Sequence, residues 1–180
     1  MSTRAEASAA RLAAHGYRGR DGLVRALGDD STAVRAEAAF VLGEQGAETA
    51  PAALERALAD ESARVRVEAA FALARLGRRD AAVPLLRREL EGALFADAPL
   101  RAARALARLG DPSGYPRVLE ALRSELPSNR MEAIAVLPDF VPFAGQDGID
   151  PVGALEAALE DPEELLRRDA RAALDALGAS

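Results

Sequence analysis

The sequence predicts an all-α protein built as a solenoid of stacked repeats, and three observations support this fold class. Residues Val34–Leu42 return almost unchanged as Val65–Leu73, which is 31 residues further along the 180-residue chain. Each copy is followed by a glycine at the same distance, Gly46 and Gly77. The hydrophobic fraction is 49% but only 4% is aromatic, and a composition rich in Ala and Leu suits closely packed short helices. Self-similarity at this period indicates stacked helical units rather than one globular core.

Five alanines anchor the repeat, Ala38, Ala69, Ala102, Ala133 and Ala170, and they lie 31, 33, 31 and 37 residues apart. A leucine follows every anchor by four residues, and a glycine follows by eight residues in all copies except the fourth, which has Val141. Near the N-terminus, Ser8, Leu12 and Gly16 take the three equivalent places. The pattern therefore predicts half a repeat followed by five helix pairs, or about eleven helices.

The elements follow in order along one predicted domain that covers residues 1–180. A lone helix is expected at about residues 2–14, and each later repeat has a first helix A and a second helix B that holds the anchor. The predicted repeats span approximately 1–16 (the half repeat), 20–46, 49–77, 80–110, 112–141 and 150–178. The glycines are expected to end the B helices in the left-handed conformation.

Helix starts are predicted from capping residues. Ser31 and Ser62 can cap the first two complete B helices, because a serine oxygen accepts a hydrogen bond from a free backbone N–H at a helix start. An aspartate followed by proline predicts three more starts, at Asp111-Pro112, Asp150-Pro151 and Asp161-Pro162.

The connection between the fourth and fifth repeats is unusually long. Pro138 should end helix B of the fourth repeat, and residues 139–150 then show no helical period. Phe140 and Phe143 are apolar where a linker would be polar, so they either pack beneath the loop or form a partner-binding tip. The shorter segment 92–99 offers the same two alternatives, and we favour packing for both.

The repeat motif resembles a HEAT repeat. It consists of Leu-x3-Leu, then Asp, then Val-Arg-x2-Ala-Ala-x2-Leu, then Gly, and it is clearest in Leu23–Gly46, Leu54–Gly77 and Leu155–Gly178. The motif is most similar to the short bacterial HEAT-like repeats of phycobilisome lyases. This resemblance implies a right-handed α-solenoid of the HEAT/armadillo type whose B helices line the concave surface.

The resemblance also implies a ladder of ion pairs between neighbouring repeats, formed by the Asp before helix B and the Arg near its start. The matching residues are Asp29 with Arg35, Asp60 with Arg66, and Asp161 with Arg167. The third repeat has Ala98-Pro99 in place of Val-Arg, and the fourth has Ser124 in place of the Asp. We expect these pairs to be structural rather than catalytic, and we look for function in the irregular middle repeats.

One face of the B helices is the candidate binding surface, at offsets −5, −1, +2 and +6 from the anchor. Its aromatic and basic members include Phe40, Phe71, Arg75, Arg101, Arg104 and Arg108. The two phenylalanines share an offset and should stack side by side, while the last three arginines line one helix with Arg75 beside them. Like charges at this spacing repel one another unless a negatively charged group neutralises them. That group is either a carboxylate or phosphate of a partner, or Glu68 and Glu132 of the chain itself.

The composition excludes several functional classes. The chain has no Cys and one His, His15, so thiolate sites and multi-histidine metal sites are ruled out. We expect no catalytic residue, no cofactor and no metal. No apolar run approaches the roughly 20 residues of a membrane span, and we expect a monomeric, cytoplasmic protein. Residues 1–138 hold 20 arginines and 19 acidic residues, whereas residues 139–180 hold 3 and 10, which argues against a nucleic-acid groove along the whole chain.

We interpret the chain as a non-catalytic scaffold that binds a protein or peptide with an acidic group on its concave face. The arginine cluster would hold the acidic group, and the phenylalanines of the face and loop would add apolar contact. The alternative, implied by the resemblance, is an accessory subunit of a bilin or tetrapyrrole lyase, in which the arginines hold propionates. A third interpretation, a DNA-binding glycosylase of HEAT-like fold, is disfavoured because Trp is absent and the face carries both charges.

Overall fold

The computed structural model of the chain describes residues 3–46, 50–92 and 98–178. Within these ranges the protein is all-helical, with eleven α-helices and three short 3-10 helices, so the predicted all-α repeat fold is confirmed. The chain forms two compact units, Met1–Glu89 and Leu90–Ser180. That one repeat domain covers residues 1–180 stays a prediction. None of the helices in the described ranges has both the length and the apolar character needed to cross a membrane.

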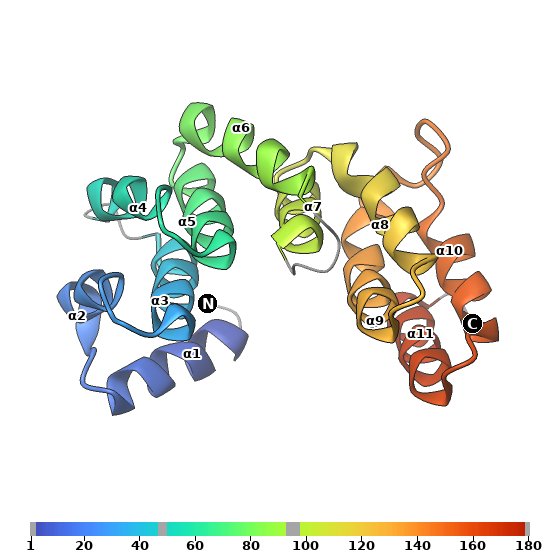
Figure 1. The fold of residues 1–180 in the computed structure, drawn as a ribbon, viewed down its shortest axis with the longest axis horizontal. Helices are drawn as coiled ribbons and strands as arrows, with labels where there is room; N and C mark the ends of the chain where they lie inside the picture. Colours follow the sequence, from blue (N-terminus) through green and yellow to red (C-terminus); the bar gives the residue numbers. More distant parts are fainter. Residues whose placement is uncertain (1–2, 47–49, 93–97, 179–180) are drawn as a thin grey trace. The chain divides into compact units, whose positions relative to one another are not determined.

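The first unit contains six helices: α1 (Thr3–Ala14), α2 (Gly19–Ala26), α3 (Thr32–Glu44), α4 (Pro51–Ala57), α5 (Ala63–Arg75) and α6 (Arg79–Leu90), the last of which ends one residue past the unit. Helix α3 packs between α1 and α5, while α2 packs against α3 and α4 against α5 (Figure 1). The half repeat therefore supplies α1, and the next two repeats supply one A and one B helix each.

The second unit contains α7 (Ala98–Arg108), η1 (Pro112–Gly114), α8 (Tyr115–Leu122), α9 (Pro127–Val136), η2 (Leu137–Phe143), α10 (Pro151–Ala157), η3 (Ala158–Glu160) and α11 (Glu164–Leu177). The B helices again form an inner row, because α9 packs against both α7 and α11. The A helices α8 and α10 pack on α9 and α11 respectively.

The repeated residues are the ones that build the core. All five anchor alanines are 0% exposed, and the leucines four residues later are at most 5% exposed. In the half repeat, Ser8 and Leu12 are 2% and 0% exposed. The sequence period therefore marks the positions where neighbouring helices pack most closely, and only a small side chain fits at the anchor.

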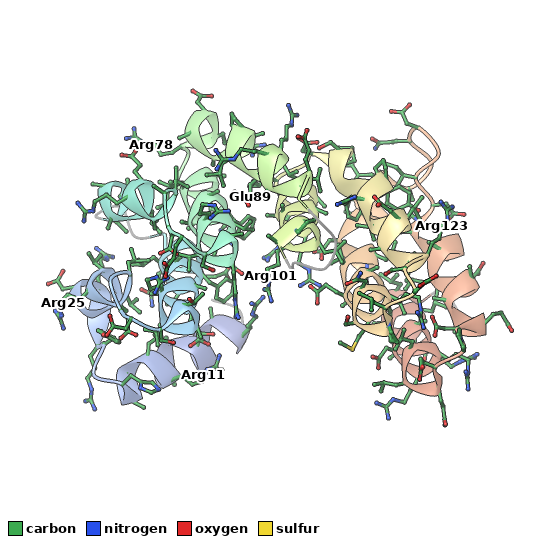
Figure 2. The ribbon with its side chains drawn as sticks, viewed as in Figure 1. Arg11, Arg25, Arg78, Glu89, Arg101 and Arg123 are labelled. Atoms are coloured by element: carbon green, nitrogen blue, oxygen red, sulfur yellow. The ribbon has the colours of Figure 1, made fainter. Side chains whose placement is uncertain are left out.

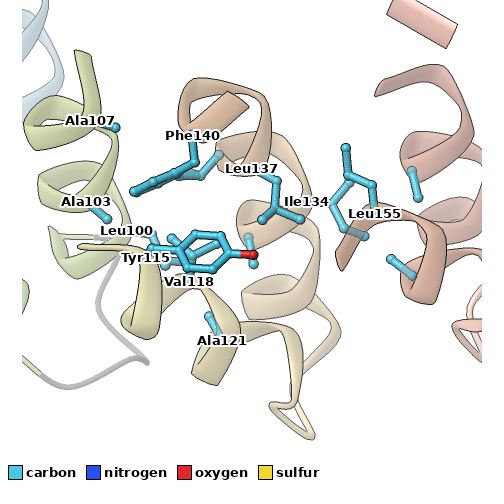
Figure 3. Close-up of a cluster of buried hydrophobic side chains, with 14 of the residues drawn as sticks. Leu100, Ala103, Ala107, Tyr115, Val118, Ala121, Ile134, Leu137, Phe140 and Leu155 are labelled. Carbon is cyan, nitrogen blue, oxygen red and sulfur yellow. The ribbon is translucent and has the colours of Figure 1, made fainter. Parts of the chain in front are cut away.

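The predicted loop after Pro138 is partly helical, which corrects the expectation of an irregular segment. Helix α9 ends at Val136, and the chain continues as the 3-10 helix η2 instead of losing its helical form at residue 139. A 3-10 turn tolerates Pro138 at its start, since the first N–H groups of a helix have no internal partner. The turn carries Phe140 into the core of the second unit, where the phenylalanine ring is 0% exposed (Figure 3). The same two alternatives for the segment 92–99 concern its apolar residues Leu94 and Phe95, which lie outside the described residues.

The capping predictions are confirmed in part. Asp111 and Asp150 accept hydrogen bonds from the backbone N–H groups of Ser113 and Gly153 at their helix starts. The five predicted C-terminal glycines, Gly16, Gly46, Gly77, Gly110 and Gly178, all have positive φ angles between 62° and 89°.

Three capping predictions were wrong. Ser31 and Ser62 occupy the N-cap positions, but their hydroxyls cap nothing. The carboxylates of Asp29 and Asp60 instead accept their backbone N–H groups at 2.7 and 2.8 Å, because an aspartate two residues earlier reaches that donor. The Asp161-Pro162 pair lies before the helix, since α11 begins at Glu164 with Glu163 as its N-cap.

Helices α3 and α5 approach each other closely at Gly43. A Cβ atom added at this position would lie 2.7 Å from both Cα and Cβ of Ala72. The Gly43→Ala substitution should therefore destabilise the protein, although alanine favours an isolated helix by about 1 kcal/mol. We expect the melting temperature to fall by about 3–6 °C in a thermal unfolding experiment.

The matched control is Gly28→Ala, since a Cβ there would meet only the carbonyl oxygen of Arg25 at an ordinary 3.6 Å. An equal or higher melting temperature for Gly43→Ala than for the wild type would contradict the close helix contact.

Candidate functional site

The arginine at the start of each regular B helix is held in a repeated geometry. Nη1 of Arg35, Arg66 and Arg130 donates to two backbone carbonyls of the turn before the same helix, at 2.9–3.1 Å. The Nε and Nη2 atoms of each arginine donate to one carboxylate from the following repeat, at 2.7–3.1 Å. These acceptors are Asp60, Glu89 and Asp161. The ladder implied by the resemblance is therefore present, and each rung joins the arginine of one repeat to the acid of the next.

Charge pairing in the rungs keeps the acids ionised. Hydrogen bonds from Arg66 and Arg130 lower the pKa values of Glu89 and Asp161. Burial raises the pKa of Asp60, but the hydrogen bonds from Arg35 and from the Ser62 N–H outweigh burial, so that pKa also lies below its ordinary value. The acid that pairs with Arg66 is Glu89, which lies within α6 (Figure 2). The repeat pattern instead predicts an aspartate in the turn before helix B. These pairs link neighbouring repeats, and we assign them a structural role.

The ladder has one gap and one open end. Pro99 stands where the third repeat would carry its arginine, and Ser124 stands where the fourth would carry the accepting acid, so both sides of one rung are absent. Arg167 of the fifth repeat donates through Nη1 to the carbonyls of Asp161 and Pro162 at 2.7 and 3.0 Å. No carboxylate in the described part of the chain forms a hydrogen bond or ion pair with Arg167.

The structure places Phe40 and Phe71 at equivalent points of the neighbouring helices α3 and α5, where they are only 5% and 6% exposed. The guanidinium of Arg4 lies 4.4 Å from the centroid of the Phe40 ring, and that of Arg75 lies 5.9 Å from the Phe71 ring. Arg75 also pairs with Glu44 through Nη1. The two phenylalanines therefore pack within the first unit under arginine side chains and leave little ring surface for a partner.

The predicted arginine stripe runs along α7 of the second unit. Arg101 and Arg104 are half-buried and Arg108 is exposed, and all three lie on one side of the helix by their i, i+3 and i+7 spacing. Arg104 forms ion pairs with two acids of the same unit. Its Nε lies 3.3 Å from Oδ2 of Asp139, and its Nη1 lies 3.7 Å from Oε1 of Glu132. Its Nη2 donates to the carbonyl of Ala135 at 2.8 Å.

Two acidic residues, Glu132 and Asp139, lie near the arginine stripe. Burial raises the pKa of Asp139, and the nearby Arg104 and Arg108 oppose that shift without cancelling it. Glu132 was expected as an internal partner of the cluster, and Asp139 was not. Arg104 therefore pairs with two carboxylates, from α9 and η2, while Arg108 also lies near Asp139 and both Arg101 and Arg108 have interaction partners within the chain.

Phe140 and Phe143 lie in the packed loop rather than at a partner-binding tip. The Phe140 ring contacts the Tyr115 ring at 5.3 Å between centroids, and Phe143 at 6.3 Å. The Tyr115 hydroxyl accepts a hydrogen bond from the Asp150 N–H at 3.0 Å, which ties the far end of the loop to the core that contains the Tyr115 and Phe140 rings. Figure 3 shows these two rings within the buried cluster. Packing, the favoured alternative, thus describes Phe140, while Phe143 is partly buried against the cluster.

The second unit has exposed apolar residues, of which Leu165 lies on the predicted binding face, at offset −5 from its anchor, whereas Leu126 and Met131 were missed by sequence reasoning. Leu126, Met131 and Leu165 are 50%, 42% and 48% exposed. Met131 lies at offset −2, where Ala36, Val67 and Leu100 of the first three complete repeats are 1%, 1% and 2% exposed. Aligning the repeats by offset places Met131 at this position. Only the structure shows that the position is exposed in the fourth repeat while it is buried in the first three.

The sequence-predicted site residues therefore divide between the two units. The first unit brings together Phe40, Phe71 and Arg75. The second unit brings together the α7 arginines and, separately, Phe140 in its core with Phe143 partly buried against that core. Within the described residues, no group of three or more His, Asp or Glu side chains could hold a metal ion.

Comparisons with known proteins identify the repeat. The family model described as HEAT repeats matches residues 20–93, and the model described as the PBS lyase HEAT-like repeat matches residues 99–124. None of the curated proteins compared with the chain matches it.

Two solved structures share the fold. The X-ray structure of the YibA protein of Escherichia coli aligns with 95% of this chain at 18% identity and a TM-score of 0.59. The complex of CpcE and CpcF of phycocyanin lyase from Nostoc sp. PCC7120 aligns with 90% of it at 23% identity and a TM-score of 0.52. The chain spans 63% and 66% of the lengths of these two proteins.

Proposed function

Because the chain belongs to the HEAT-repeat proteins, we propose that it is a non-catalytic scaffold that binds an acidic segment of a partner protein. The proposed surface, called the unit-2 B face, consists of Arg101, Arg104 and Arg108 on α7, Met131 on α9 and Leu165 on α11. The observation that carries the proposal is the exposure of Met131, at a position that is buried in the three preceding repeats, on the helix next to the arginine stripe.

The charges of this face suit an acidic partner. Arg104 is fixed by three interactions with Glu132, Asp139 and the Ala135 carbonyl, so it loses little side-chain freedom on binding. Arg108 is exposed at the end of α7 and can meet a carboxylate that approaches from solvent. Guanidinium groups bind carboxylates through two parallel hydrogen bonds, which set orientation and association rate more than affinity.

The exposed apolar residues of the face provide a second contribution to binding, beside that of its charges. Met131 and Leu165 are exposed on the adjacent helices α9 and α11. Burying such side chains under a partner removes apolar surface from water, which is worth about 1.5–3 kcal/mol for each fully buried chain. We therefore expect a peptide that combines acidic residues with at least one large apolar residue. One structural neighbour is itself a complex of two chains, CpcE and CpcF, which is consistent with a binding role for the fold.

A peptide-display selection tests this proposal. The wild-type chain should enrich acidic peptides with an apolar residue. Arg108→Glu and Leu165→Ser should each weaken binding of the selected peptide by about tenfold or more, as expected for the loss of a charged or apolar contact. The matched control is Arg123→Glu, which reverses an exposed arginine at the end of α8 (Figure 2) and should leave binding unchanged.

Enrichment of basic peptides, or equal binding by Arg108→Glu and the wild type, would contradict the proposal. Two further assays separate the alternatives. Visible absorbance from a bound tetrapyrrole would favour a lyase subunit, and salt-sensitive retention of DNA would favour a nucleic-acid enzyme.

A further inference from the structure

Arg167, in the first turn of α11, forms one half of a ladder rung. Its Nη1 atom donates to the carbonyls of Asp161 and Pro162, which lie six and five residues earlier, at 2.7 and 3.0 Å. The same two spacings hold in the three complete rungs, at Arg35, Arg66 and Arg130. The carbonyl bonds therefore orient the Arg167 guanidinium as they do in a complete rung.

The other edge of this guanidinium, formed by Nε and Nη2, carries no carboxylate. Within the described residues neither atom forms a hydrogen bond. The buried side-chain nitrogens that lack a partner in this part of the chain belong to Arg64, Arg104 and Arg117. Since Arg167 is half-buried and is not one of these residues, its Nε and Nη2 atoms are accessible to solvent. A ligand can therefore reach the edge that holds the acid in the complete rungs.

The nearest acid of the same turn is committed to the preceding rung. The carboxylate of Asp161 accepts hydrogen bonds from Nε and Nη2 of Arg130 and from the Glu163 N–H, at 2.7–3.1 Å. The bonds from Arg130 are the main cause of the low pKa of Asp161, and Arg167 contributes only through its charge. Asp161 is therefore a neighbour of Arg167 but not the acid of its rung.

One side of α11 beside Arg167 is charged. Helices α9 and α11 lie side by side (Figure 1). By helical spacing, offsets −2, +1 and +5 from the anchor share the side of a B helix that meets the next repeat, as Gly43 at +5 meets Ala72. In the first complete repeat this side carries the buried residues Ala36, Ala39 and Gly43. In the fifth repeat it carries the exposed residues Arg168, Arg171 and Asp175.

An acidic segment suits this side of α11, whereas a further apolar repeat does not. An apolar helix pair stacked on it would bury the guanidiniums of Arg168 and Arg171 without counter-charges, which is strongly unfavourable. Carboxylates of a partner would neutralise these charges, because guanidinium groups bind carboxylates through two parallel hydrogen bonds. Beside Asp175, this side carries the positive charges of three arginines, Arg167 included.

We propose that Arg167 is the binding site for an Asp or Glu side chain in an acidic segment of a partner protein. The complete rungs show that the same guanidinium edge takes either kind of side chain, since its acceptors are Asp60, Glu89 and Asp161. Arg167 and Leu165 are two residues apart and point to nearly opposite sides of α11. The site is therefore separate from the unit-2 B face and does not rest on it.

Nitrogen-15 NMR of the arginine Nε–H groups tests the site directly. The probe is the tripeptide acetyl-Glu-Asp-Glu-amide, titrated into the full wild-type chain. The Arg167 resonance, identified by its absence in Arg167→Lys, should shift and saturate. The Arg35 resonance, identified with Arg35→Ala, should not move, because Asp60 already occupies that edge.

Binding by variants gives the second readout. Arg167→Lys keeps the charge but loses the two-point contact, so it should bind the tripeptide about tenfold more weakly. The matched control is Arg25→Lys, which changes an exposed arginine of α2 (Figure 2) and should bind like the wild type. The Arg108→Glu variant should keep the Arg167 shift, so that failure of the proposed function and failure of this site give different results.

Three outcomes would overturn the proposal. The first is an Arg167 resonance that does not move in the wild-type chain, a result that does not depend on how any variant folds. The second is equal binding by Arg167→Lys and the wild type, or saturation by inorganic phosphate but not by the tripeptide. The third is a dimer in analytical ultracentrifugation that Arg167→Lys dissociates, which would make the occupant a second copy of this chain.

Discussion

Replacing Arg35 with alanine should lower the free energy of unfolding by about 3 kcal/mol, because the change leaves a buried carboxylate without its counter-charge. The Arg35 and Asp60 side chains are only 8% and 11% exposed. The guanidinium makes two hydrogen bonds to Asp60 and two to the carbonyls of Asp29 and Asp30, and it also lies 3.3 Å from Glu61. Urea unfolding followed by circular dichroism measures the difference.

Arg167→Ala is the matched control for this prediction. Arg167 keeps the two carbonyl bonds of a ladder arginine but pairs with no carboxylate in the described part of the chain. The difference between the two variants therefore isolates the contribution of the carboxylate rung. If Arg35→Ala cost no more than Arg167→Ala, the rungs would add nothing to the stacking of the repeats.

The pH dependence gives a second readout of the same rung. The folded-state pKa of Asp60 is depressed, so its contribution to stability is present above the unfolded-state pKa and is lost as the pH falls through the folded-state value. The stability difference between wild type and Arg35→Ala should therefore shrink in acid, at pH values below the ordinary range of an aspartate. A difference that grows in acid would contradict the assigned direction of the shift.

The ladder also shows how far the sequence alone could go. The spacing identified Asp29, Asp60 and Asp161 together with Arg35 and Arg66, because each stands at a fixed distance from an alanine anchor. It did not show that the carboxylate for Arg35 comes from Asp60 of the next repeat, while Asp29 contributes its backbone carbonyl. Which acid pairs with Arg35 depends on how one helix pair is displaced relative to the next. The residue spacing within a single repeat carries no information on that displacement. Glu89 was missed for the same reason.

The candidate site was predictable only at the level of the helix face. The offsets predict that the α7 arginines share one side of one helix, because helical periodicity determines side-chain direction. They could not show that Phe40 and Phe71 would be almost fully covered, since burial depends on the neighbouring helix and on Arg4 above the ring. Nor could they show that Met131 would be exposed where its equivalents are buried. Exposure is a property of the packed repeats, and an offset gives only orientation.

Replacing Phe140 with alanine should be the most destabilising single change in the second unit, at about 4 kcal/mol. Its side chain is 0% exposed and contacts the rings of Tyr115 and Phe143. The small side chain would leave a cavity between η2 and the core, because helices on several sides hold the surrounding residues in place. Calorimetry and urea unfolding should both register the loss.

Two variants decide whether this loss comes from the cavity. Phe140→Leu should cost much less than Phe140→Ala, since leucine refills part of the volume. Phe143→Ala should also cost less, because Phe143 is only partly buried against the cluster. Equal losses for Phe140→Ala and Phe143→Ala would mean that the loop packs as a separate layer on the surface. The expected order, with Phe140→Ala alone severe, would mean that the segment after Pro138 is part of the core. The surface left for a partner in this unit would then be the row of B helices and not the loop.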